Sequence, residues 1–586
     1  LFAALNILES LYEACLERMR FFLEEWGETG RKNHPNYQKL FTDTLKRVED
    51  HPNHRYFIFK SIIVNNLYGV DIMEEAVEIC KLRLFLKLVA QIERVEDIEP
   101  LPDIDFNIRA GNSLIGFVSL EEVKKTQEGT LGFGKSEVSR IEEEAEIADR
   151  AFRKFREMQT AQGMSPSDFS EAKENLRARL KKLTDELDRF LAGEYGINKS
   201  NILGKKKFSD AFEKWRKSHQ PFHWFADFYG ILKVGGFDVI IGNPPYVSAR
   251  KVSDYTIRGY KIQECPDIYA WCIERVIALT HRASMTGMIV PLSICFSGDF
   301  DPLRRLLLSK YSENWFSSFG RIPSALFAHD VRVRNTIHLG ARHSINPGHN
   351  SSRLNRWFDA ERPHLFHLLS YSRFNPILWK WRIPKLNTQR VVDAFEFLLG
   401  SNGHRIDSIL LSHQTSHNLF FKKTAYNWLT FCISLPPCYD ENGSPIPHTK
   451  FGEVYFANPQ YRDIAFLLLN GKLEFAFWCA VGDDFDVTRW MFADFPGDIS
   501  RLPSTTFQEL LPIAEKLRTA TGKAVSFKLN AGKKVGTYNL ALCRNVTDLS
   551  DAIFAKILGF SDAWDDVELL YTEIVRTNFD DEGDDL

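Results

Sequence analysis

Short apolar runs alternate with helical patterns along the first 340 residues, and this alternation constrains the fold more than any other feature. The runs lie at 66–73, 105–109, 237–242, 286–290 and 331–340. Runs of this length read as buried strands, and their alternation with helices is typical of a parallel sheet in an α/β fold. The chain has 586 residues, of which 44% are hydrophobic, and this composition excludes disorder, collagen and coiled-coil rods.

The helical patterns place an amphipathic helix at residues 1–19 and another at 75–88. Residues 137–195 carry mixed charges and helical spacing of Leu, Ile and Phe. They predict two antiparallel helices joined near 163–166, inserted between the second and third strands. The insertion can be purely structural, or it can clamp DNA or dock a partner.

Charge is distributed unevenly along the chain. The 74 basic and 77 acidic residues give a net charge of −3, which by itself predicts no nucleic-acid partner. Residues 321–390, however, hold twelve basic and only three acidic residues, a local charge of +9, with tryptophans interleaved. Arginine with aromatic residues suits phosphate contact and base stacking, so Arg332, Arg334, Arg353 and Arg356 are candidate DNA-binding residues. The alternative is an ordinary solvated surface.

Membrane, metal and disulfide chemistry receive no support from the sequence. No run reaches the roughly 18 apolar residues that a membrane span needs. Nine scattered cysteines without a signal peptide indicate reduced thiols and a cytoplasmic protein. His413 and His417 share helical spacing but have no third ligand, so no metal is expected.

A rigid polar turn, Asn243-Pro244-Pro245-Tyr246, directly follows the run 237–242. Consecutive prolines fix φ and lack amide hydrogens, so the turn is stiff and presents carbonyl oxygens. The Asn243 side chain adds an acceptor, and two acceptors suit an exocyclic NH₂ group with its two hydrogens. Tyr246 offers a ring face for a planar base. The turn therefore suits methyl transfer to a planar amine, although four such residues can also form a simple strand-end turn.

The segment FDVIIGNPPYV resembles the hallmark of the S-adenosylmethionine-dependent N6-adenine DNA methyltransferases. The segments LYGVDIMEEAVEICKLRLFLKL, NIRAGNSLIG, DIYAWCIERVIAL, GMIVP and LFAHDVRVRNTI agree with that family in order. Over residues 1 to about 340 the chain is most similar to the methylase part of large type IIG restriction–modification enzymes and related phage-defence methylases. The resemblance implies a Rossmann-like methyltransferase sheet, S-adenosylmethionine as cofactor, double-stranded DNA as substrate, and restriction or defence subunits as further partners.

The resemblance also implies roles for residues that match the family's motifs. Asp71 would bind the two ribose hydroxyls of the cofactor, and Ile72 would flank its adenine. Asn112, with Ser113 beside it, would lie near the cofactor adenine and the target site. Asp267 matches either a helix cap or a cofactor contact.

On the target side, the resemblance makes Asn243, Pro244, Pro245 and Tyr246 the catalytic residues. The Asn243 side chain and the Pro244 carbonyl would hold the target N6 amine, while Tyr246 would stack on the flipped adenine. Phe327 would pack on the other face of the base, or it is an ordinary core residue. The implied mechanism is base flipping followed by direct displacement of the methyl group from the sulfonium, without a metal or a covalent intermediate.

Five parts are expected along the chain. Residues 1–130 and 223–344 would form the two parts of the methyltransferase domain, interrupted by a helical, coiled-coil-like insertion at 131–222. Residues 345–535 match the position of a mixed α+β DNA target-recognition domain, and 536–586 would be a helical tail. The family's Gly-rich cofactor loop and first strand do not occur in the sequence, so we expect the first strand to be missing and this chain to be inactive without residues upstream of Leu1.

Two alternative functions remain open. The chain can be a degenerate, cofactor-free remnant that only binds DNA or a partner, which the absent Gly-rich loop supports and the intact turn opposes. It can also methylate another planar amide, as the protein-glutamine methylases with the same turn do. The chain length, the basic aromatic block and the large C-terminal part argue against that second alternative.

Overall fold

The computed structural model describes residues 1–94, 99–128, 135–160, 165–198, 205–327, 333–401 and 404–575. The chain divides into two compact units. Unit 1 contains residues 1–237 and 252–259, and unit 2 contains residues 238–251 and 260–586. Each unit is described by itself below.

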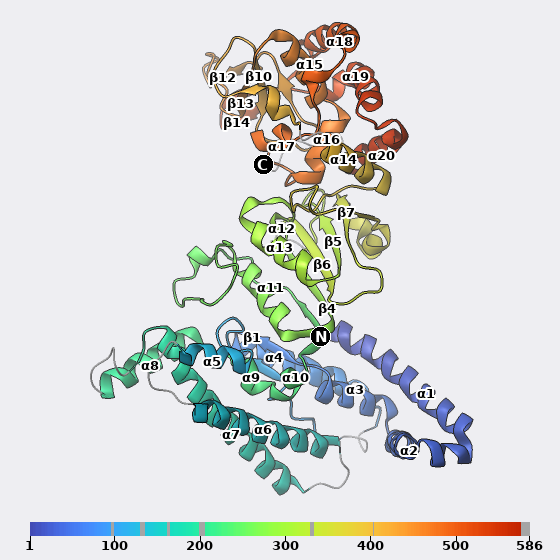
Figure 1. The fold of residues 1–586 in the computed structure, drawn as a ribbon, viewed down its shortest axis with the longest axis vertical. Helices are drawn as coiled ribbons and strands as arrows, with labels where there is room; N and C mark the ends of the chain where they lie inside the picture. The colour runs from blue at the N-terminus through green and yellow to red at the C-terminus, as the bar shows by residue number, and fades with distance from the viewer. Residues whose placement is uncertain are drawn as a thin grey trace. The chain divides into compact units, whose positions relative to one another are not determined.

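Unit 1 is mainly helical and carries one small parallel sheet (Figure 1). Its strands, β1 (Gly69–Asp71) and β2 (Ile108–Ala110), pair in parallel, with Asp71 opposite Ala110. Its helices are α1 (Phe2–Asn33), α2 (Pro35–Glu49), α3 (His54–Asn65), α4 (Glu74–Val89), α5 (Leu120–Glu128), α6 (Lys135–Thr160), α7 (Pro166–Glu194), α8 (Lys205–His219), α9 (Trp224–Asp227) and α10 (Tyr229–Lys233).

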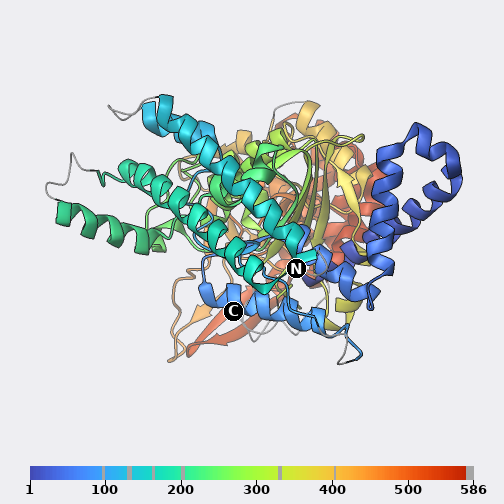
Figure 2. The same ribbon diagram turned by 90° about the horizontal axis from the view of Figure 1, so that it is seen from below.

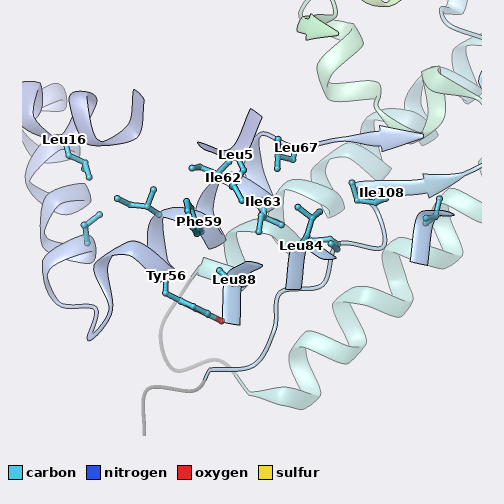
Figure 3. Close-up of a cluster of buried hydrophobic side chains, with 14 of the residues drawn as sticks. Leu5, Leu16, Tyr56, Phe59, Ile62, Ile63, Leu67, Leu84, Leu88 and Ile108 are labelled. Carbon is cyan, nitrogen blue, oxygen red and sulfur yellow. The ribbon is translucent and has the colours of Figure 1, made fainter. Parts of the chain in front are cut away.

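A hydrophobic cluster joins α1, α3, α4 and β2, as Figure 3 shows. Phe59 and Ile62 of α3 are completely buried between Leu5 of α1 and Leu88 of α4. A buried polar group closes the end of this cluster, since the Asn107 side-chain amide donates to the carbonyl oxygens of Val64 and Leu67 at 3.0 and 3.1 Å. The predicted helix at 75–88 is therefore confirmed as α4, positioned by α3 behind the two strands.

The two helices predicted within residues 137–195 are confirmed as α6 and α7, which run side by side in both views (Figure 1 and Figure 2). Ser165 caps α7 by accepting from the Ser167 amide, and Pro166 occupies the first turn, where its missing N–H costs nothing. Leucines at helical spacing form the buried face of α7: Leu176, Leu180, Leu183 and Leu187. Tertiary packing of this face therefore holds the helix in place.

Unit 2 contains a six-stranded mixed sheet in the order β3-β4-β6-β5-β7-β8. The strands are β3 (Phe237–Gly242, which starts at the last residue of unit 1), β4 (Thr280–Pro291), β5 (Glu313–Phe319), β6 (Asn335–Ala341), β7 (Gly348–Asn355) and β8 (Tyr371–Arg373). Helices α11 (Ile268–Leu279), α12 (Ser293–Phe296) and α13 (Asp301–Lys310) accompany the sheet, and α11 packs against both β4 and α13.

The expectation of a parallel sheet is wrong for most of unit 2. Pairing is parallel between β5 and β7, as it is between β1 and β2 in unit 1. It is antiparallel between β4 and β6, β5 and β6, and β7 and β8. An apolar run indicates that a strand is buried, but not whether it runs parallel or antiparallel to its neighbours. Central antiparallel strands that are covered on both faces have the same composition as parallel ones.

The rest of unit 2 is mixed α/β. It contains a four-stranded sheet, β11 (Phe431–Cys432), β10 (Asn418–Lys422), β13 (Phe451–Phe456) and β9 (Leu410–Leu411), and a three-stranded sheet, β12 (Cys438–Tyr439), β15 (Lys533–Tyr538) and β14 (Val525–Asn530). Its helices are α14 (Gln389–Ser401), α15 (Pro459–Leu469), α16 (Lys472–Val481), α17 (Arg489–Ala493), α18 (Ser504–Lys523), α19 (Arg544–Ile557) and α20 (Trp564–Ile574).

Helix α16 is entirely buried, and so is the second half of α15, Ile464–Leu469. Within the described ranges, no single helix is long and apolar enough to cross a membrane, and only this pair, bent by 68°, passes that test jointly by length and composition.

Candidate functional site

The polar turn lies at the carboxyl end of β3, where the strand ends at Gly242. Asn243 and Pro245 are exposed, while Pro244 and Tyr246 are half-buried. The two prolines cannot donate to a neighbouring strand, so β3 cannot continue through them. An acceptor-rich turn is thus presented to solvent from the end of a sheet strand, as the sequence predicts.

Hydrogen bonds of Tyr246 hold this turn together. The Tyr246 hydroxyl lies 2.7 Å from Asn243 Oδ1 and 2.9 Å from the carbonyl oxygen of Ile289 on β4. The side-chain Nδ2 of Asn335 donates to the same hydroxyl oxygen at 3.3 Å. Burial raises the pKa of Tyr246 to about 12, and the Asn335 hydrogen bond opposes that rise. The phenol is therefore neutral at physiological pH and can donate its hydrogen.

Asn335 is a site residue to which the sequence analysis gave no role. It is the first residue of β6, completely buried, and pairs with Pro291 on β4 and Phe319 on β5. Its position inside the segment LFAHDVRVRNTI is the only sequence signal that points to it. An Asn at the start of a strand is otherwise unremarkable, so only the contact with Tyr246 distinguishes it.

The candidate cofactor residues lie at the carboxyl ends of β1 and β2 in unit 1. Asp71 and Ile72 are exposed, and one Asp71 carboxylate oxygen accepts from the Met73 amide at 2.9 Å. In addition, the Asp71 backbone carbonyl accepts from the Gly111 amide at 2.8 Å. This contact places Asn112 just beyond the end of the neighbouring strand. The segments that contain Asp71 and Asn112 therefore lie side by side within this unit.

Asn112 is buried, and its Oδ1 accepts from the Leu114 amide at 3.1 Å. Its Nδ2 has no hydrogen-bond partner among the described residues. Ser113 is half-buried, with its carbonyl oxygen accepting from the Trp224 indole at 3.0 Å. A buried donor without a partner beside an exposed carboxylate and an exposed Ile side chain fits a nucleoside, which supplies acceptors, vicinal hydroxyls and a flat ring.

Of the other predicted site residues, the structure describes Phe327 and Asp267 but not Arg332. Phe327 is half-buried and ends a described stretch, while Arg332 lies outside the described residues. Asp267 begins α11, but its side chain makes no capping hydrogen bond. Burial and the nearby Asp299 raise the pKa of Asp267. The turn and the cofactor residues belong to different units, so the structure describes them separately.

Two of the expected DNA-binding arginines are corrected by their burial. Arg356 is 1% exposed and is bound to Asp484, with N–O distances of 2.6 and 3.0 Å. Arg353 is 8% exposed and pairs with Glu573 at 3.0 Å. Arg334 is largely buried and lies 3.7 Å from an oxygen of Asp484. Acidic residues far along the chain therefore compensate this part of the +9 block inside unit 2, which the local sequence could not reveal.

Residues 252–259, which follow the turn, pack on the helical insertion within unit 1. The Tyr195 hydroxyl donates to the Thr256 carbonyl at 3.0 Å, and the Thr256 amide donates to His219 Nε2 at 3.3 Å. Arg258 donates to the Glu194 carbonyl at 3.1 Å and lies over the Tyr195 ring. The insertion thus contacts a segment that begins only six residues after Tyr246.

Comparison with known proteins gives a family match for the central segment of the chain. Residues 65–323 match the Eco57I restriction-modification methylase family. This stretch contains the polar turn, Asp71 and Asn112, so the match covers the main candidate site residues. The resemblance to restriction–modification methylases drawn from the sequence is thereby confirmed for these residues.

Individual proteins are similar to parts of this chain. A protein of Methanocaldococcus jannaschii named "Putative type II restriction enzyme and methyltransferase" is 30% identical over 285 residues, which are 42% of this chain and 24% of that protein. The chain thus matches about a quarter of the length of this relative. Among solved structures, the type IIL restriction-modification enzyme MmeI in complex with DNA is 11% identical with a TM-score of 0.39, over 98% of this chain and 78% of MmeI. The type IIG restriction endonuclease BpuSI is 8% identical with a TM-score of 0.21, over 59% and 55% of the two chains.

Proposed function

We propose that this chain is the methylase part of a site-specific DNA methyltransferase that transfers a methyl group from S-adenosylmethionine to N6 of adenine. The enzyme would serve a restriction–modification or phage-defence system. The observation that supports this most is the turn at the end of β3, where the exposed Asn243 carboxamide is held by the Tyr246 hydroxyl at 2.7 Å. The turn offers fixed acceptors to an amine that approaches from solvent.

Asp71, Ile72, Asn112 and Ser113 would hold the cofactor, which supplies an electrophilic methyl group on a sulfonium. The Asp71 carboxylate is exposed and matches two vicinal hydroxyls, and the exposed Ile72 side chain offers an apolar face to an adenine ring. The unpartnered Nδ2 of Asn112 suits a ring nitrogen or hydroxyl oxygen as acceptor. These residues orient the cofactor and take no part in bond breaking.

The target adenine would leave the duplex by base flipping. Asn243 Oδ1 and the Pro244 carbonyl would accept its two N6 hydrogens, which directs the nitrogen lone pair toward the methyl group. The Tyr246 ring would stack on one face of the base and Phe327 on the other. Positioning and acceptor electrostatics then account for catalysis, without a metal or a covalent intermediate.

Double-stranded DNA is the proposed partner, with restriction or defence subunits beside it. Residues 345–535 are proposed as the target-recognition part, and of the four candidate arginines Arg332 remains a proposed DNA contact. An enzyme that modifies chromosomal or phage DNA works in the cytoplasm, so we place the protein there.

The test is methylome sequencing of a host that expresses the complete gene. We expect N6-methyladenine at one new sequence motif with the wild type and none with Asn243→Ala. Asn346→Ala, an exposed asparagine in a loop of the same unit, is the matched control and should methylate as the wild type does. A methylome without a new motif, or one that persists in Asn243→Ala, contradicts the proposal.

A further inference from the structure

The Tyr246 hydroxyl has more neighbours than its single hydrogen can serve. Two acceptors lie within hydrogen-bond distance, Asn243 Oδ1 at 2.7 Å and the Ile289 carbonyl at 2.9 Å. A phenol donates one hydrogen and accepts through its oxygen lone pairs. It can therefore donate fully to only one acceptor at a time, and any third polar neighbour has to be a donor.

Asn335 supplies that donor through Nδ2 at 3.3 Å. The residue is completely buried, and its Oδ1 has no hydrogen-bond partner among the described residues. Burying an amide with an unsatisfied oxygen is unfavourable, whereas a Leu of similar volume would carry no such penalty. A hydrophobic residue would be the simpler choice for the start of a buried strand, so the amide is explained by what it does to Tyr246.

We propose that Asn335 is a positioning residue of the methyl-transfer site and that it fixes the Tyr246 hydroxyl. Asn243 Oδ1 can then give up its hydrogen bond from that hydroxyl and accept one from the target amine instead. The inference rests on the proposed function and assigns a residue to which the family resemblance gave no role. Asn335 touches neither substrate nor cofactor and acts only through Tyr246.

The exchange conserves hydrogen bonds. Before the target arrives, Tyr246 donates to Asn243 Oδ1 and thereby holds the carboxamide in place. When the amine donates to Asn243, the hydroxyl hydrogen turns to the Ile289 carbonyl, which is already 2.9 Å away. The hydroxyl oxygen stays anchored by Asn335 throughout, so the ring does not move and its face remains available for stacking. Asn243 is released without leaving a buried hydroxyl unsatisfied.

A double-mutant cycle tests the proposal in the complete protein, with S-adenosylmethionine and unmethylated host DNA as substrates. Tyr246→Phe keeps the ring and removes the hydroxyl, and Asn335→Leu removes the donor. We expect each to lower kcat by about tenfold, with little change in the KM for DNA, since each removes one hydrogen bond that orders the turn. The double variant should also lose about tenfold, because Asn335 acts through the hydroxyl. A loss near a hundredfold in the double variant, or full activity of Asn335→Leu, overturns the proposal.

Two further variants separate positioning from stability. Asn335→Asp preserves the shape, and its ionised carboxylate offers only acceptors, so at a pH above the titration of that carboxyl group it should lower kcat as Asn335→Leu does. Asn314→Ala removes a completely buried asparagine from β5, where its side chain contacts Tyr311 and His338 at the far end of the strand pair. We expect Asn314→Ala to lower the melting temperature with kcat unchanged. An unchanged kcat in Asn335→Asp contradicts the proposal.

A spectroscopic measurement decides the point independently of methyl transfer. Fluorotyrosine can be incorporated into the complete protein, and the ¹⁹F resonance of residue 246 is the one that disappears in Tyr246→Phe. A donor hydrogen bond stabilises a phenolate, so this resonance should titrate at higher pH in Asn335→Leu than in the wild type. An identical titration refutes the contact. If the wild type methylates no DNA, the proposed function fails while this titration still decides the role of Asn335.

Discussion

Arg356 and Asp484 form a buried ion pair in unit 2. The guanidinium donates to Asp484 at 2.6 and 3.0 Å and to the Asn427 side chain at 3.0 Å. It also donates to the carbonyl oxygens of Tyr426 at 2.7 Å and Ile574 at 3.1 Å. Arg356 and the Asp484 side chain are each 1% exposed. These partners come from segments 70 to 218 residues away, so the pair ties the C-terminal part of unit 2 to β7.

Removing the carboxylate with Asp484→Ala should lower the free energy of unfolding by about 3–5 kcal/mol. The guanidinium stays buried but loses the Asp484 carboxylate that compensates its charge. Urea unfolding followed by circular dichroism measures the loss. The double variant Arg356→Met with Asp484→Leu should recover most of it, because replacing both members of a buried pair by apolar residues is often neutral.

Arg390→Met is the matched control for Arg356→Met. Arg390 pairs with Asp566 at 2.9 Å, but its side chain is 71% exposed, so its loss should cost no more than about 1 kcal/mol. If Arg356 instead contacted DNA phosphates, Arg356→Met would leave stability unchanged and would reduce the salt dependence of DNA binding. That result, or a stability loss below 1 kcal/mol in Asp484→Ala, would refute the structural role.

Three further predictions concern other sites. Asp551 accepts from the Lys472 amide, and burial raises its pKa from 3.8 to about 7. The contribution of the protonated Asp551 side chain to the free energy of unfolding is therefore complete below pH 4 and is lost as the pH rises through 7. Asp551→Asn should gain up to ~4 kcal/mol relative to the wild type between pH 4 and pH 8, and a pH-independent difference in urea midpoints would contradict this. Gly320→Ala should destabilise by about 1–3 kcal/mol in the same assay, because its Cβ would lie 3.2 Å from Asp484 Oδ2 in a packed interior. Asp71→Ala should weaken S-adenosylmethionine binding at least about tenfold in calorimetry, with unfolding unchanged because the side chain is exposed; equal affinity would remove Asp71 from the site.

Local sequence patterns were sufficient to predict a strand or helix whose formation depends mainly on its own residues. The expected strand at 237–242 coincides with β3, because an apolar run followed by two prolines has only one place to end. The expected insertion coincides with α6 and α7 because leucine spacing and the cap at Ser165 are encoded locally. The position of the turn is predictable from the sequence because it is defined by four consecutive residues.

The sequence could not predict which distant segments contact one another, and the reason is physical. The direction of β6 depends on which strands lie beside it, and its antiparallel partners β4 and β5 were indistinguishable by composition from parallel ones. The arginines of residues 321–390 were read as a surface because their counter-charges, Asp484 and Glu573, are more than 90 residues further along the chain. Asn335 could not be predicted as a site residue, because its significance rests on one contact with Tyr246, 89 positions earlier.

The helical insertion holds the segment 252–259 in place within unit 1. The backbone of Thr256 is bound by Tyr195 at the end of α7 and by His219 at the end of α8. Arg258 of the same segment donates to the Glu194 carbonyl at 3.1 Å. A segment that is fixed at several points loses less conformational entropy when it orders around a substrate. The helices of the insertion therefore preorganise residues 252–259, without any contact to DNA being required of them.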